Sequence, residues 1–98
     1  MTTNDISFLT KLEAIIETRI ADDDADSYTA SLASAGVKRV AQKVGEEAVE
    51  LALAAVSGDR NEQIEESADL VYHLTVLLNL SGIRLADVVA TLEQRHAD

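Results

Sequence analysis

The stretch Lys-Val-Gly-Glu-Glu-Ala-Val-Glu, residues 43–50, constrains the fold more than any other part of the chain. At about 100° per residue on an α-helix, its charged residues fall on one narrow stripe. They are Lys43, Glu46, Glu47 and Glu50. The rest of the segment from Val37 to Val56 is mostly valine, alanine and leucine, and a helix that is apolar nearly all round is usually buried. Because clustered carboxylates repel one another there, we expect a positive group among them.

The composition predicts an all-α protein. The 98 residues include no proline, four glycines, two tyrosines and one phenylalanine, whereas β-sandwiches need aromatic strands and turns rich in glycine and proline. This length predicts a single domain over residues 1–98. Since so short a chain buries only roughly 60–70% of its unfolded surface, we expect dimerisation to complete the helical bundle.

Charge and hydropathy exclude several classes of partner. A formal net charge of −10 argues against nucleic acid, because phosphate backbones select basic surfaces. No apolar run approaches the roughly 18–20 residues of a membrane span, and no signal-peptide pattern opens the chain. The chain has no cysteine, which excludes disulfides and thiolate zinc sites. We therefore expect a cytoplasmic protein that binds no membrane.

Apolar residues at helical spacing predict four main helices and a short one. The first begins at Phe8 and continues to Ile20, and we expect its charged face, which includes Glu13, to be exposed. A short helix capped by Ser27 or Thr29 is expected to run through residue 32 and to be ended by Gly36. The others are expected over residues 37–57, from 60 or 61 to 80, and over 85–96, with glycines near their ends. The last helix carries an apolar face that we expect to point inward: Leu85, Val88, Val89 and Leu92.

A second acidic stripe lies on the helix that ends at residue 80. Its members are spaced at i, i+3 and i+4: Glu62, Glu66, Asp69 and His73. The short loop between the two long helices predicts an antiparallel hairpin. Because both stripes are about equally far from the turn, we expect carboxylates from the two helices to converge in one cleft.

Oxygen ligands on rigid helices suit a hard cation, and Mg²⁺ is the default choice. A di-iron site would need two Glu-x-x-His motifs, and only His96 has a glutamate at that spacing. Carboxylates near Lys38 and Lys43 suit hydrolysis of a phosphoanhydride by water. The chain lacks a Gly-x-x-x-x-Gly-Lys-Ser/Thr loop, which excludes a P-loop enzyme. The simpler alternative is a solvated acidic face on which Lys43 pairs with Glu46 or Glu47.

Several short motifs resemble a known enzyme family. Glu46-Glu-x-x-Glu50 with Glu66-x-x-Asp69 is similar to the metal motif of the all-α (MazG-like) NTP pyrophosphatase superfamily. The flanking motifs are Ser27-Tyr-Thr29, Lys43-Val-Gly-Glu-Glu-Ala48 and Ala68-Asp-Leu-Val-Tyr-His73. Together they resemble the phosphoribosyl-ATP pyrophosphatase family of histidine biosynthesis over about residues 27–96.

The resemblance implies magnesium-dependent hydrolysis of phosphoribosyl-ATP to phosphoribosyl-AMP and pyrophosphate by a homodimer. It implies that the Mg²⁺ ligands are Glu46, Glu47, Glu50, Glu66 and Asp69, with the first three as catalytic residues. It implies substrate contacts from Lys38 and Lys43 and, more loosely, from Ser27, Tyr28, Thr29, Tyr72 and His73.

Two other functions remain compatible with the residues. A housecleaning pyrophosphatase acting on another nucleoside triphosphate would use the same carboxylates. A non-catalytic helical dimerisation module would use only the apolar faces, and it would tolerate the loss of the carboxylates.

Overall fold

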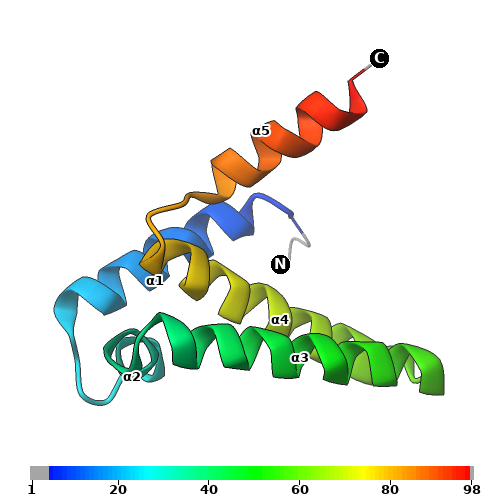
Figure 1. Ribbon diagram of the computed structural model, residues 1–98, viewed down its shortest axis with the longest axis horizontal. Helices are drawn as coiled ribbons and strands as arrows, with labels where there is room; N and C mark the ends of the chain where they lie inside the picture. The colour runs from blue at the N-terminus through cyan, green and yellow to red at the C-terminus, as the bar shows by residue number, and fades with distance from the viewer. Residues whose placement is uncertain (1–4, 98) are drawn as a thin grey trace.

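The computed structural model describes residues 5–97, and over that range the chain forms five α-helices and no strand (Figure 1). They are α1 (Phe8–Asp22), α2 (Tyr28–Ala35), α3 (Val37–Ser57), α4 (Arg60–Leu80) and α5 (Leu85–His96). The predicted all-α class, with four main helices and a short one, is confirmed. The last three helices have the predicted bounds, and α2 begins after its predicted cap Ser27 and ends at Ala35, directly before the predicted Gly36.

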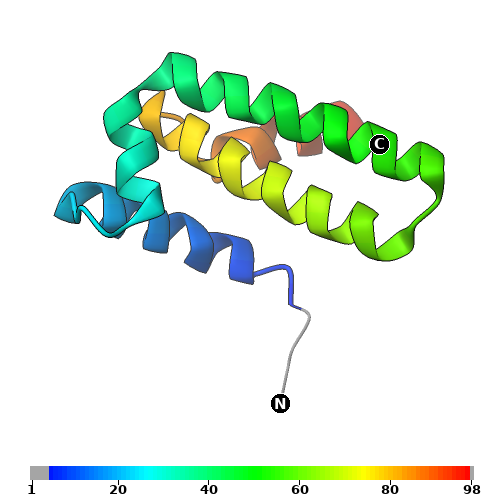
Figure 2. The same cartoon turned by 90° about the horizontal axis from the view of Figure 1, so that it is seen from below.

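The long helices α3 and α4 lie side by side as the predicted antiparallel hairpin (Figures 1 and 2). Gly58 ends α3 with φ of 81°, a left-handed conformation that glycine adopts without strain, and its N–H donates to the oxygen of Ala54. Asp59 then caps α4 by accepting a hydrogen bond from the Glu62 N–H at 3.1 Å. These two residues bring the acidic stripes of α3 and α4 face to face.

The core lies at the end of the hairpin away from its turn, where α1 and α2 meet the start of α3 and the end of α4 (Figure 2). Its buried members come from all four helices: Ile16, Leu32, Val40 and Val76. Five partly buried residues pack around them: Leu12, Ile20, Tyr72, Leu77 and Leu80. Because Tyr72 belongs to this core, the packing also fixes the neighbouring part of α4 that carries functional candidates.

The far end of α3 corrects the prediction of a buried helix. Among the described residues of this single chain, the buried ones on α3 are Val40, Glu47 and Ala54. Leu53 is 65% exposed and Val56 is 89% exposed. Beyond the reach of α1 and α2, only α4 packs on α3, so the remaining apolar sides of the helix face solvent.

The last helix also differs from expectation, because none of its described residues is buried. Val89 is 51% exposed and Leu92 is 49% exposed, so the described residues leave much of the face predicted to point inward uncovered. The chain bends by 107° between α4 and α5, and α5 points away from the hairpin (Figure 1). Over residues 5–97, no single helix is long and apolar enough to span a membrane; α4 and α5 together reach that length and composition only across this bend.

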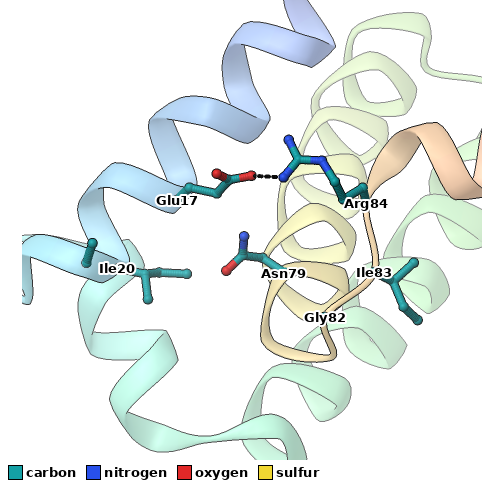
Figure 3. A pocket seen from close by; sticks show the side chains of 7 residues that line it. Glu17, Ile20, Asn79, Gly82, Ile83 and Arg84 are labelled. Carbon is teal, nitrogen blue, oxygen red and sulfur yellow. Dashed lines mark ion pairs between the residues drawn. The ribbon is translucent and has the colours of Figure 1, made fainter.

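An ion pair between the buried Glu13 and the exposed Arg84 joins the start of α5 to α1. Glu13, predicted to be exposed, is only 6% exposed, because its carboxylate accepts from Arg84 Nη2 at 3.0 Å and from the Leu85 N–H at 2.7 Å. Arg84 Nη1 also lies 2.8 Å from Glu17 Oε1, beside a hollow between α1 and the α4–α5 loop (Figure 3). The carboxylate of Glu13 therefore fixes where α5 begins.

We expect Glu13→Gln to lower the free energy of unfolding by about 1–3 kcal/mol, because the guanidinium loses a buried charged partner. Urea denaturation followed by circular dichroism measures this change. Glu93→Gln, on exposed α5, is the matched control and should leave the free energy within about 0.5 kcal/mol. Equal effects of the two substitutions would contradict a structural role for Glu13.

Candidate functional site

Three carboxylates from the two long helices meet across the hairpin. Glu47 of α3 and Glu66 and Asp69 of α4 each offer an oxygen, and these oxygens lie within 4.8 Å of one another. We call these three residues the acid cluster. Glu47 is buried, Glu66 is half-buried and Asp69 is exposed, so the acid cluster is open to solvent on the Asp69 side. The two acidic stripes thus face each other, as the hairpin predicts.

Two oxygens of the acid cluster lack hydrogen-bond partners among the described residues. They are Glu47 Oε2 and Glu66 Oε2, and both are buried. Burying an unpaired carboxylate oxygen is costly, so such atoms usually have a hydrogen-bond donor or a cation nearby. The other oxygen of Glu47 has one, because Lys43 Nζ lies 3.3 Å from Glu47 Oε1. Their hydrogen bond is the main reason why the pKa of Lys43 is raised.

These observations fit a hard divalent cation. Each donor in the acid cluster is a carboxylate oxygen, the type that Mg²⁺ and Ca²⁺ prefer. Two of these oxygens are buried without a donor, and one side of the group is open to water and to phosphates. Lys43 neutralises only part of the local negative charge. The acid cluster therefore has the composition of a cation site.

Glu50 adjoins the acid cluster from the next turn of α3. The interaction with the Glu50 carboxyl is the largest cause that raises the pKa of Glu66 to about 7, followed by desolvation and by the charges of Glu50, Glu47 and Asp69. A proton on this pair therefore relieves part of the repulsion in the cation-free protein. A bound cation would compete with that proton for the same oxygens.

Beside Glu50 and Glu66, an acidic hollow of about 540 Å³ extends toward the hairpin turn. It is lined by Glu50, Leu53, Ala54, Ser57, Glu62, Glu65 and Glu66. Sequence analysis missed Glu65 because it falls outside the i, i+3 and i+4 stripe that singled out its neighbours. Its only signal was its position next to Glu66 in the sequence.

Two residues expected at the site lie at its edge. Glu46 is exposed, at 3.8 Å from Lys43 Nζ, and its Oε2 accepts a hydrogen bond from Gln42 Nε2 at 3.1 Å. The Glu46 carboxylate is not a member of the acid cluster. Lys38 is exposed on the first turn of α3. Gln42 was missed, although its i, i+4 spacing to Glu46 is the one that favours such a bond.

The remaining candidates form a hydrogen-bonded group between α2 and α4. The Ser27 hydroxyl caps α2 by accepting from the Ala30 N–H at 3.1 Å. The Tyr28 hydroxyl lies 2.9 Å from His73 Nε2, and the hydroxyls of Thr29 and Tyr72 share a hydrogen bond. Thr29 and His73 are buried, whereas Tyr28 is 53% exposed. Of this group, Tyr28 is therefore the most accessible to a ligand.

Glu66 should make the stability of the cation-free protein depend on pH. A carboxyl whose pKa is raised by folding binds more protons in the folded state, so losing them favours unfolding. We expect the urea midpoint to fall as the pH rises from about 5 to about 8, through the Glu66 pKa of about 7, and Mg²⁺ to restore it at the upper pH. In Glu66→Gln the fall should be smaller, and an unchanged pH profile in that variant would rule out this origin.

Comparison with known proteins places the chain in a family. Residues 9–96 match the profile of the family described as phosphoribosyl-ATP pyrophosphohydrolase. The phosphoribosyl-ATP pyrophosphatase of Pyrobaculum aerophilum is 56% identical over 85 residues, which cover 87% of this chain and 90% of that protein. The histidine biosynthesis bifunctional protein HisIE of Photobacterium profundum is 55% identical over 89 residues, 91% of this chain and 43% of that protein. This chain thus spans less than half of the bifunctional relatives that it matches. The chain belongs to the phosphoribosyl-ATP pyrophosphohydrolase family.

Proposed function

We propose that the chain is a hydrolase that converts phosphoribosyl-ATP into phosphoribosyl-AMP and pyrophosphate, with Mg²⁺ as its cofactor. The observation that carries this proposal is the acid cluster, with two buried oxygens that have no donor among the described residues. The family match and the relatives named phosphoribosyl-ATP pyrophosphatase support this choice of substrate. We also propose a cytoplasmic location and no role for nucleic acid or membranes.

In this proposal Glu47, Glu66 and Asp69 hold the cation. When bound, the cation neutralises charge on the phosphates and increases the acidity of a water. Glu50 is the candidate general base, because it adjoins Glu66 without belonging to the acid cluster and is exposed. Its carboxylate accepts the proton of the attacking water.

Two lysines and one glutamate act around this centre. Lys43 Nζ lies 3.3 Å from Glu47 Oε1. When a cation binds the Glu47 carboxylate, Lys43 can turn toward a phosphate oxygen. Lys38, exposed one turn earlier on α3, adds positive charge where a polyphosphate enters. The exposed Glu46 has its Oε1 3.8 Å from Lys43 Nζ, so we propose that Glu46 orients Lys43.

The choice of substrate has a direct test. With Mg²⁺ present, we expect pyrophosphate release from phosphoribosyl-ATP at a kcat/KM at least about 100-fold above that for ATP, GTP, CTP, UTP or their deoxy forms. Chelation with EDTA should abolish release and added Mg²⁺ should restore it. Preference for one of the canonical nucleotides would instead favour the housecleaning pyrophosphatase.

Neutral variants test the carboxylates. We expect Glu50→Gln, Glu66→Gln and Asp69→Asn each to lower kcat/KM by about 100-fold or more. The urea midpoint near neutral pH should stay level or rise, because each change removes repulsion within the group. The matched control is Gln63→Glu on the same helix, a residue outside the acid cluster, which should keep turnover within about two-fold. Full activity of all three neutral variants would favour the non-catalytic dimerisation module.

We further propose that a second copy of the chain covers the apolar sides of α3 and α5. Val49, Leu53 and Val56 on α3 are 59%, 65% and 89% exposed, and Val89 and Leu92 on α5 are about half exposed. Monomers seldom expose that many large apolar side chains on their helices. A two-fold interface would bury them and would lie beside Glu50, which shares α3 with them.

Sedimentation velocity at micromolar concentration tests the homodimer. We expect one species at twice the chain mass of 10.5 kDa, and a shift to the monomer in Leu53→Asp, because a buried unpaired charge opposes association. Thr18→Asp, on the exposed face of α1, is the matched control and should remain dimeric. A monomeric wild-type chain, or a dimeric Leu53→Asp variant, would contradict this interface.

A further inference from the structure

The buried ring of His73 connects the acid cluster to α2. His73 is 5% exposed, and its Nδ1 lies 2.7 Å from the backbone oxygen of Asp69, a member of the acid cluster. Its Nε2 lies 2.9 Å from the Tyr28 hydroxyl. A single imidazole therefore separates the phenol of Tyr28 from the backbone of a candidate cation ligand.

The partners of the ring determine which way each hydrogen bond runs. A backbone carbonyl only accepts, so Nδ1 carries the proton and donates it to Asp69. A ring that carries its proton on Nδ1 alone offers Nε2 as an acceptor, and the Tyr28 hydroxyl, 2.9 Å away, then donates to it. The Tyr28 hydroxyl therefore uses its proton in the hydrogen bond to His73 Nε2.

Packing holds the ring in this orientation. The Tyr72 ring meets it edge-on at a centroid distance of 5.0 Å, and the Tyr28 ring does so at 5.9 Å. Tyr72 is in turn anchored by its hydroxyl, which bonds to that of the buried Thr29. These two aromatic contacts, together with the two hydrogen bonds, restrict the ring and keep its nitrogens on their two partners. The half-exposed Tyr28 is the member of this group that a ligand can reach.

We infer that His73 is a positioning residue that makes the Tyr28 hydroxyl an acceptor for a donor group of the substrate, a sugar hydroxyl or an amino group. This inference rests on the proposed function and specifies what recognises the nucleoside part of the substrate. With its proton directed to Nε2, the phenol presents lone pairs, which attract an O–H or N–H and repel a phosphate oxygen. Lys43 and the cation held by the acid cluster then bind the phosphates.

Long-range ¹H–¹⁵N NMR of the cation-free and substrate-free protein tests the hydrogen-bond directions. At about pH 8, where free imidazole is neutral, we expect Nδ1 of His73 to be protonated and Nε2 to be bare. His96, exposed at the end of α5, is the internal reference. Tyr28→Phe should shift the Nε2 resonance of His73 and leave the tautomer unchanged. A proton on Nε2 of His73 would overturn the inference whether or not the chain hydrolyses phosphoribosyl-ATP.

Calorimetry with Mg·ATP and Mg·tripolyphosphate tests the role in recognition, because tripolyphosphate has the phosphates but no sugar or base. We expect Tyr28→Phe to weaken ATP binding about 3- to 10-fold, as for one lost hydrogen bond, and to leave tripolyphosphate binding unchanged. His73→Asn should have the same effect and add nothing to Tyr28→Phe. His73→Gln, whose Oε1 can accept near the position of Nε2, should restore ATP binding. His96→Gln should change neither ligand. Equal loss for both ligands, or no loss for ATP, would overturn the inference.

Turnover separates this inference from the proposed function. If phosphoribosyl-ATP is hydrolysed, Tyr28→Phe should raise KM about 3- to 10-fold with kcat within about two-fold. A fall in kcat with KM unchanged would contradict binding through Tyr28. Absence of hydrolysis by the wild-type chain, together with the expected tautomer and the selective loss of ATP binding, would refute the proposed reaction and retain the role of His73.

Discussion

Repulsion among the carboxylates of the α3–α4 hairpin is the constraint on which the rest of the structure depends. Glu47, Glu66 and Asp69 bring oxygens within 4.8 Å of one another, although two of their buried oxygens have no donor among the described residues. Lys43 offsets part of that repulsion, and the raised pKa of Glu66, about 7, favours a proton that offsets more of it. Both are groups that a divalent cation could displace. Natural proteins tolerate such local conflict chiefly at functional sites.

The stability that offsets this conflict lies elsewhere in the molecule. Ile16, Val40 and Val76 are buried at the end of the hairpin away from its turn, where four helices meet. The same packing places α2 against α4, so that Tyr28 reaches His73 beside the acid cluster. The candidate site is therefore a polar centre that is held by an apolar core at one end of two long helices. The apolar sides that the core leaves exposed are the ones assigned to a second copy.

Local signals in the sequence were sufficient to predict the helices and to predict that the two acidic stripes face each other. Gly58 and Asp59 define the hairpin turn, and the spacing from that turn determines which carboxylates meet. Contacts between distant segments were not predictable in this way. Glu13 looked like a solvated residue because its partner, Arg84, is far along the chain. The apolar pattern of α3 and α5 predicts that these faces are buried. It does not distinguish burial against the same chain from burial against another chain.

A Mn²⁺-soaked crystal with anomalous diffraction data would test the central claim most directly, since Mn²⁺ takes the same oxygen ligands as Mg²⁺. The account predicts an anomalous peak between α3 and α4, within about 2.0–2.4 Å of carboxylate oxygens from Glu47, Glu66 and Asp69. It also predicts that the peak disappears in a crystal of Glu66→Gln. A Mn²⁺ ion bound elsewhere, with Lys43 still paired to Glu47 and no density in the acid cluster, would contradict it.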